Sequence, residues 1–119
     1  MDLRTLTPGL AVCAQITPDD VAALKAQGVR SIICNRPDQE EAGQPDFADI
    51  AAAARAAGIT ARYIPVKSGM VTEADAAAFG AALEEMPRPV VAYCRSGSRS
   101  ASLWSMQEAA AGSTASPTG

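Results

Sequence analysis

The stretch of sequence that decides the fold spans residues 89–100 and reads PVVAYCRSGSRS. The apolar run PVVAY predicts a buried strand, and Cys94 follows directly at its end. A short polar loop with one glycine and two arginines comes next, and residues 101–106 (ASLWSM) are typical of a helix. A strand, a tight loop and a helix N-terminus in this order bind anions through backbone N–H groups and the helix dipole.

The residue types in this loop suit a nucleophile that holds an anion. Loop N–H groups, the helix dipole and Arg99 all favour the thiolate of Cys94, and such surroundings lower a cysteine pKa to roughly 3.5–7.5. Gly97 permits a positive φ or a close backbone approach, so that successive N–H groups point inward. The planar guanidinium of Arg99 suits two oxygens of a sulfate- or phosphate-like group. We therefore predict Cys94 and Arg99 as catalytic residues.

The other loop residues are predicted to contribute to binding of the substrate anion; they are Arg95, Ser96, Gly97, Ser98 and Ser100. We expect the Ser100 hydroxyl to donate to the Cys94 thiolate or to cap the helix. Arg95 and Ser98 are expected to point outward. The alternative is a buried structural cysteine followed by a polar turn, but the cysteine, glycine and arginine all fall where an anion-binding nucleophile needs them.

The composition indicates one domain and excludes several classes of function. A length of 119 residues is typical of a single domain, and an apolar fraction of 48% is enough for a core. The net charge of −3 gives no basic surface for nucleic acid. The longest apolar runs are too short to span a membrane, and the N-terminus lacks the apolar core of a secretory signal. The sequence does not indicate an oligomeric state.

The cysteine and histidine counts restrict the chemistry. The chain has three cysteines, Cys13, Cys34 and Cys94, without Cys-x-x-Cys spacing, so we expect reduced thiols and a cytoplasmic location. It has no histidine, which excludes a Cys–His nucleophile pair and a His-based metal site. We therefore expect neither a metal nor a cofactor.

Hydrophobic patterns and helix caps predict an alternation of strands and helices. Strands are expected at 10–15, 29–35, 59–66 and 89–93, the first of them at an edge of the sheet, and helices at 17–28, 46–58, 72–86 and 98–111. Thr17, Asp46 and Thr72 are the predicted N-caps. The alternation predicts an α/β fold, with a mostly parallel sheet of about four to five strands and helices on both faces. Residues 1–111 are the expected domain, and 112–119 a disordered tail.

A long polar loop, residues 36–45 (RPDQEEAGQP), follows the strand at 29–35. Open α/β sheets bind ligands at the carboxyl ends of their strands, so Arg36 and Asp38 are candidate accessory residues. A solvated loop without function is the alternative. Cys34, at the end of the same strand, is predicted either to pack in the core or to reach Cys94 as a resolving thiol.

The loop Cys-x-x-Gly-x-Arg resembles the active-site loop of rhodanese-type sulfurtransferases. It also resembles the loop of tyrosine and dual-specificity phosphatases, which have one more residue between cysteine and arginine. Over residues 6–106 the chain more closely resembles a bacterial family, the phosphatase-like domain of the β-lactamase hydrolase-like protein. The stretches that carry this resemblance are 15–17 (QIT), 29–38 (VRSIICNRPD), 63–66 (YIPV) and 92–100 (AYCRSGSRS). The resemblance implies a protein tyrosine phosphatase-like fold and either phosphate hydrolysis or sulfur transfer.

One departure from the phosphatases bears on the reaction. Dual-specificity phosphatases carry an aspartate general acid just after the strand that matches 63–66, where this chain has Lys67, Ser68 and Gly69. Asp38, Glu40 or Asp75 could substitute, and no spacing selects one of them.

Three hypotheses follow from these observations. The first is a sulfurtransferase that carries sulfane sulfur as a Cys94 persulfide, and its substrate would be a small anion or a sulfane-sulfur donor. The second is a cysteine-dependent phosphatase that forms a phosphocysteine from a phosphorylated substrate. The third is a non-catalytic anion-binding module.

Overall fold

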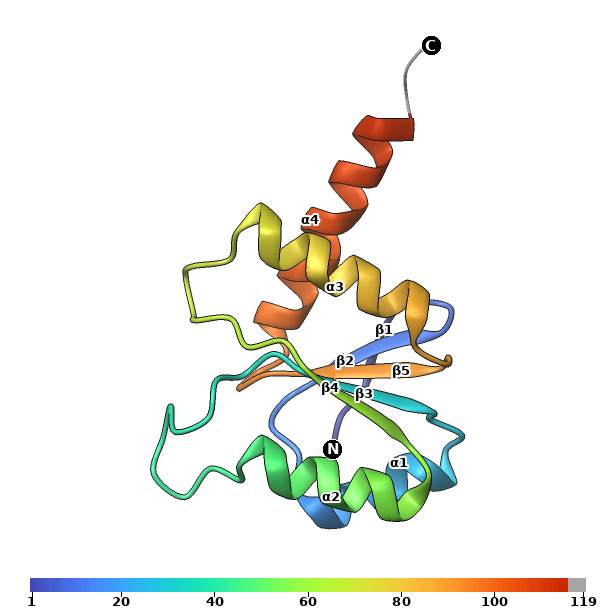
Figure 1. Cartoon of the computed structure of the whole chain (residues 1–119), viewed down its shortest axis with the longest axis vertical. Helices are drawn as coiled ribbons and strands as arrows, with labels where there is room; N and C mark the ends of the chain where they lie inside the picture. The colour runs from blue at the N-terminus through green and yellow to red at the C-terminus, as the bar shows by residue number, and fades with distance from the viewer. Residues whose placement is uncertain (116–119) are drawn as a thin grey trace.

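A computed structural model describes residues 1–115 of the chain. It consists of one five-stranded sheet with two helices on each face (Figure 1). The strands are β1 (Arg4–Thr7), β2 (Leu10–Cys13), β3 (Ser31–Cys34), β4 (Thr60–Tyr63) and β5 (Val90–Tyr93). The helices are α1 (Pro18–Ala26), α2 (Phe47–Ala57), α3 (Glu73–Glu85) and α4 (Ser98–Ala115). The predicted α/β fold with helices on both faces is confirmed.

The sheet has the order β1-β2-β5-β3-β4, in which β2, β5, β3 and β4 are parallel. The prediction that the strand near residue 10 lies at the edge was wrong, because β1 pairs antiparallel with β2 on its outer side. A turn at Pro8 and Gly9 reverses the chain, and Gly9 adopts a φ of +88° there. The sequence RTLT of β1 is short and mostly polar, which hides it from a hydrophobicity pattern.

The two faces of the sheet form separate hydrophobic clusters. Because side chains alternate along a strand, Ile32 packs with α1 and α2 while its neighbour Ile33 packs with α3 and α4. Figure 1 shows α1 and α2 below the sheet and α3 and α4 above it. Phe79 and Leu83 are both buried against the upper face, as their spacing of one helical turn predicts.

The helix caps agree with the sequence at two of three places. Thr17 and Thr72 each form a capping box, in which the threonine side chain accepts from the third helical N–H. Asp46 precedes α2 but makes no capping hydrogen bond through its side chain. Asp38 replaces it, because Asp38 Oδ1 accepts from the Phe47 N–H at 2.8 Å.

The final helix is longer than the sequence indicates. It runs to Ala115 instead of ending at residue 111, and residues 116–119 of the expected tail lie outside the described part of the chain. None of the helices in the described part is long and apolar enough to cross a membrane.

The topology brings several loops to one edge of the sheet. The carboxyl ends of β2, β5, β3 and β4 all point to the left in Figure 1. The loops after β3, β4 and β5 leave the sheet there, and β5 is the central strand. Residues from positions 34–46, 64–72 and 94–99 therefore meet in space.

Candidate functional site

Cys94 lies at the centre of this edge, between β5 and the N-terminus of α4. It is 1% exposed, and the Gly97 N–H donates a hydrogen bond to its sulfur at 3.0 Å. Burial alone would raise the pKa of Cys94, but hydrogen bonds from the N–H groups of Ser100, Ser96, Arg99 and Gly97 outweigh it. The pKa of this thiol is therefore held below its usual value, which favours the thiolate.

Gly97 meets two requirements that exclude a side chain. Its φ is +94°, in the left-handed region. A Cβ atom at this position would also lie 3.3 Å from the carbonyl oxygen of Cys13, at the end of β2. Close packing of the loop against β2 thus confirms why the sequence has glycine here.

Arg99 contacts a carboxylate of the chain itself. Its side chain is 9% exposed, and its Nη1 donates to Glu40 Oε2 at 2.7 Å and to the Val66 carbonyl at 2.8 Å. Its Nη2 donates to Glu40 Oε1 at 3.1 Å. The guanidinium predicted to bind an anion is therefore held on one side by Glu40, while its Nε–H takes part in none of these bonds.

Arg36 holds the loop that carries Glu40. The Arg36 side chain is only 4% exposed, and it donates to Glu40 at 3.0 Å, to Glu41 at 3.1 Å and to Gln15 at 3.2 Å. The hydrogen bond from Arg99 lowers the pKa of Glu40, partial burial opposes this, and Arg36 lowers it further. Glu40 therefore stays ionised at neutral pH, and Arg36 acts as an anchor for the loop.

Asp38 is turned toward α2 and away from the Cys94 loop. Its carboxylate caps Phe47, and its own N–H donates to the Tyr63 hydroxyl at 2.9 Å. The rings of Phe47 and Tyr63 stack with centroids 4.9 Å apart. Asp38 thus fixes the start of the long loop to β4 and α2.

Ser100 differs from its predicted role. Its hydroxyl donates to Asn35 Oδ1 at 2.8 Å, and only its backbone N–H bonds to the Cys94 sulfur. Both side chains are fully buried, and Asn35 in turn donates to the Ile64 carbonyl at 2.9 Å. Sequence reasoning missed Asn35, although a polar residue directly after a buried strand indicates such a role.

The exposed residues of the loop lie as expected. Arg95 and Ser98 point outward, and Arg95 Nε lies 4.0 Å from Glu41 Oε1. The Ser96 hydroxyl donates to the Ser98 oxygen at 3.2 Å. The side chains of these three residues form the outer rim of the loop.

Cys34 and Cys13 are buried thiols on the strands flanking β5. Both pair in register with Tyr93 and belong to the hydrophobic cluster that α1 and α2 cover. Burial is the main cause that raises the pKa of Cys34 to about 11 and that of Cys13 to about 12. The Cys34 thiol donates to the Arg36 carbonyl at 3.2 Å. These contacts favour the interpretation of Cys34 as a core residue.

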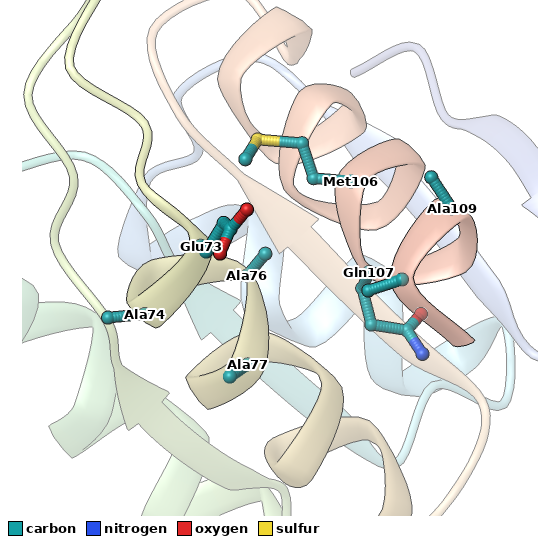
Figure 2. A pocket seen from close by; sticks show the side chains of 8 residues that line it. Glu73, Ala74, Ala76, Ala77, Met106, Gln107 and Ala109 are labelled. Atoms are coloured by element: carbon teal, nitrogen blue, oxygen red, sulfur yellow. The ribbon is translucent and has the colours of Figure 1, made fainter. Parts of the chain in front are cut away.

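Other candidate groups lie away from Cys94. Asp75, considered as an acid, belongs to the capping box of α3. Within residues 1–115 no three Cys, Asp or Glu side chains gather closely enough to hold a metal ion. A hollow of about 810 Å³ lies between α3 and α4 and is lined mainly by alanines, with Met106, Gln107 and Glu73 (Figure 2). None of the residues that line this hollow is a cysteine, and Cys94 stays the candidate nucleophile.

Comparisons with known proteins show to which family the chain is similar. Residues 2–111 match the family described as "Beta-lactamase hydrolase-like protein, phosphatase-like domain". A beta-lactamase hydrolase-like protein of Agrobacterium fabrum is 42% identical over 84% of this chain, which spans only 23% of that relative's length.

Two solved structures show the same fold. A candidate phosphatase from Neisseria meningitidis superposes with a TM-score of 0.87 at 37% identity, covering 94% of this chain and 80% of that one. A kinase-associated phosphatase, at 18% identity and a TM-score of 0.70, covers 91% of this chain and 68% of its own and shows the fold alone. The chain belongs to the family of the phosphatase-like domain of beta-lactamase hydrolase-like proteins.

Proposed function

We propose that this chain is a sulfurtransferase in which the Cys94 thiolate accepts a sulfane sulfur atom and passes it on as a persulfide. One observation carries this proposal. Four backbone N–H groups stabilise the thiolate, whereas the candidate acids Asp38 and Glu40 are bonded to the Phe47 N–H and to the Arg99 guanidinium. Sulfur transfer proceeds without a general acid, because its leaving groups are weak bases.

The proposed reaction balances without a proton donor. The Cys94 thiolate attacks the outer sulfur of thiosulfate, a Cys94 S–S bond forms, and the S–S bond of thiosulfate breaks to release sulfite with the electron pair. Cyanide or a thiolate then attacks the outer sulfur of the Cys94 persulfide. Thiocyanate or a new persulfide leaves, and the Cys94 thiolate is restored.

The surrounding groups suit this chemistry. The loop N–H groups stabilise negative charge on the Cys94 sulfur and, in the intermediate, on the persulfide. The Arg99 backbone N–H is one of these donors, and Glu40 and the Val66 carbonyl hold its guanidinium in place. The proposed substrate is accordingly a small sulfane-sulfur donor.

A cysteine-dependent phosphatase is the second candidate, favoured by the phosphatases among the similar structures. Cys94 would attack phosphorus, the alcohol oxygen would leave, and water would hydrolyse the phosphocysteine. That alkoxide needs a proton, and the loop where dual-specificity phosphatases carry their acid contains Lys67, Ser68 and Gly69.

A paired assay distinguishes the two reactions. Thiosulfate:cyanide sulfur transfer and aryl phosphate hydrolysis are measured on one preparation of the protein, of Cys94→Ser and of Cys34→Ala. We expect sulfur transfer that Cys94→Ser abolishes and that Cys34→Ala retains, because Cys34 is a protonated core thiol. Phosphate release that depends on Cys94, without sulfur transfer, would establish the phosphatase instead. Absence of both activities would refute both proposals and leave an anion-binding role.

A further inference from the structure

The carboxylate of Glu40 occupies the end of the guanidinium that the sequence predicts for an external anion. Arg99 Nη1 donates to Glu40 Oε2 at 2.7 Å and Nη2 donates to Oε1 at 3.1 Å, which is the bidentate geometry of an oxyanion ligand. Nη1 also donates to the Val66 carbonyl at 2.8 Å. The chain itself thus supplies the counter-ion of its proposed catalytic arginine.

Glu40 is fixed in this position by contacts on its other side. The side chain of Arg36, only 4% exposed, donates to Glu40 Oε1 at 3.0 Å. Arg36 is held in turn by Gln15 at 3.2 Å and by Glu41 at 3.1 Å. The preceding residue, Gln39, has a φ of +65°, a left-handed conformation that is uncommon outside glycine. A loop bonded in this way keeps the carboxylate beside Arg99 when an anion enters the site.

The site therefore offers little uncompensated positive charge. The backbone N–H of Arg99 bonds to the Cys94 sulfur, and its side chain ends on Glu40. The length of one arginine side chain thus bounds the separation between the thiolate and the carboxylate. Two further cations of the loops after β4 and β5, Lys67 and Arg95, are exposed, so solvent screens their charge. An incoming anion meets two negative groups with one guanidinium between them.

We propose that Glu40 sets the charge preference of the Cys94 site, because its carboxylate disfavours doubly charged anions relative to singly charged ones. This inference rests on the Cys94 loop as the anion site of the proposed function. Coulomb energy scales with the product of the charges, so a fixed carboxylate repels a dianion twice as strongly as a monoanion of the same shape. Phosphate monoesters, which are mostly doubly charged at neutral pH, are thereby disfavoured, and so is thiosulfate.

Protection of Cys94 from alkylation measures anion binding without any turnover. Iodoacetamide is uncharged and reacts with thiolates, so an anion bound in the loop slows its reaction with Cys94. Sulfate and perchlorate are matched probes, because both are tetrahedral with four oxygens and they carry two charges and one charge. Their protection constants are measured at neutral pH and constant ionic strength, and mass spectrometry verifies that Cys94 is the alkylated residue.

The variants remove one charge each. Glu40→Gln neutralises the carboxylate beside Arg99, and Glu41→Gln neutralises a side chain that is 57% exposed. We expect Glu40→Gln to strengthen sulfate binding by about tenfold and perchlorate binding by about threefold, since the same electrostatic factor counts twice for a dianion. Glu41→Gln should change either constant by less than about twofold, because solvent screens an exposed charge.

Three results would overturn the proposal: equal changes for the two anions in Glu40→Gln, no gain for sulfate, or no protection by either anion in any variant. Alkylation does not depend on which reaction the protein catalyses. Failure of the charge preference therefore leaves the sulfur-transfer assay to decide the proposed function, and absence of sulfur transfer leaves the charge preference to the alkylation data.

A second variant allows for the loss of stability that neutralising Glu40 causes. Gln39→Gly places glycine at the left-handed φ of +65°, where it is free of strain. The double variant Gln39→Gly/Glu40→Gln is compared with Gln39→Gly alone, and the same gains of about tenfold for sulfate and threefold for perchlorate are expected. Circular dichroism verifies the fold of each variant.

Discussion

Glu40 is the residue whose neutralisation tests the site geometry most directly. The substitution Glu40→Gln keeps the size of the side chain and one carbonyl oxygen but removes the charge that faces Arg99 and Arg36. Both arginines then lose their closest counter-ion while their side chains stay 9% and 4% exposed. We expect a loss of stability and a less firmly held Arg99.

The magnitude follows from burial. Two unit charges 4 Å apart interact by about 4 kcal/mol at an effective dielectric constant of about 20. Removing one partner of a buried ion pair costs about 3–5 kcal/mol. The Glu40 side chain is 23% exposed, so hydration by water reduces the free-energy cost of its removal. We therefore expect a loss of about 2–3 kcal/mol, or roughly 10 °C in Tm.

The neighbouring Glu41 provides a matched control. Its side chain is 57% exposed and bonds to Arg36 at 3.1 Å. The same change, Glu41→Gln, should cost at most about 1 kcal/mol, because solvent screens exposed ion pairs. Urea unfolding at pH 7 measures both losses, and thiosulfate kinetics measure the effect on Arg99. Equal losses in the two variants would refute the reasoning that burial makes the Glu40 contacts strong.

The pH dependence supplies a second check on Glu40. The pKa of Glu40 is lowered in the folded protein. Its ion pairs therefore contribute fully to the free energy of unfolding above the usual carboxyl pKa of about 4.3. The contribution is lost as the pH falls through the lower folded value. The stability difference between wild type and Glu40→Gln should stay constant from about pH 8 to 5 and close below about pH 4. A difference that persists in stronger acid would contradict the ion-pair origin.

Two further predictions concern the Cys94 sulfur. Ultraviolet titration of thiolate absorbance should show one group that ionises below the usual cysteine pKa of about 8.5. The substitution Cys94→Ser should remove this signal, because the pKa values of Cys13 and Cys34 are raised to about 12 and about 11. Ser100→Ala should cost about 1–3 kcal/mol in urea unfolding, since it leaves the buried Asn35 oxygen without its donor. The same variant should leave the pKa of Cys94 nearly unchanged, whereas a rise of about one unit would mean that the hydroxyl itself contacts the sulfur.

The backbone of the site could be predicted because its signals are local. An apolar run followed by Cys94, a glycine and an arginine identifies a strand, a loop and a helix start without knowledge of the rest of the chain. The capping boxes at Thr17 and Thr72 are likewise contained within four residues. The loop sequence alone predicts the need for glycine at position 97. The close approach of Gly97 to the Cys13 backbone is visible only in the structure.

The side-chain partners could not be predicted because they join distant segments. Asp38 caps a helix nine positions further along, in place of the adjacent Asp46, because the loop folds back on Tyr63. β1 was missed because four short, mostly polar residues pair with β2 without a hydrophobic pattern. Such pairings depend on how the loop or turn closes in space.

The sequence by itself determined the α/β alternation, the position of Cys94 at the end of a buried strand, and the cluster of N–H groups that lowers its pKa. These properties follow from backbone geometry over a dozen adjacent residues. Only the tertiary structure decided that Glu40 occupies one side of Arg99 and that Ser100 bonds to Asn35. These contacts span 59 and 65 residues of sequence, and they exist because parallel strands bring their carboxyl ends to one edge of the sheet.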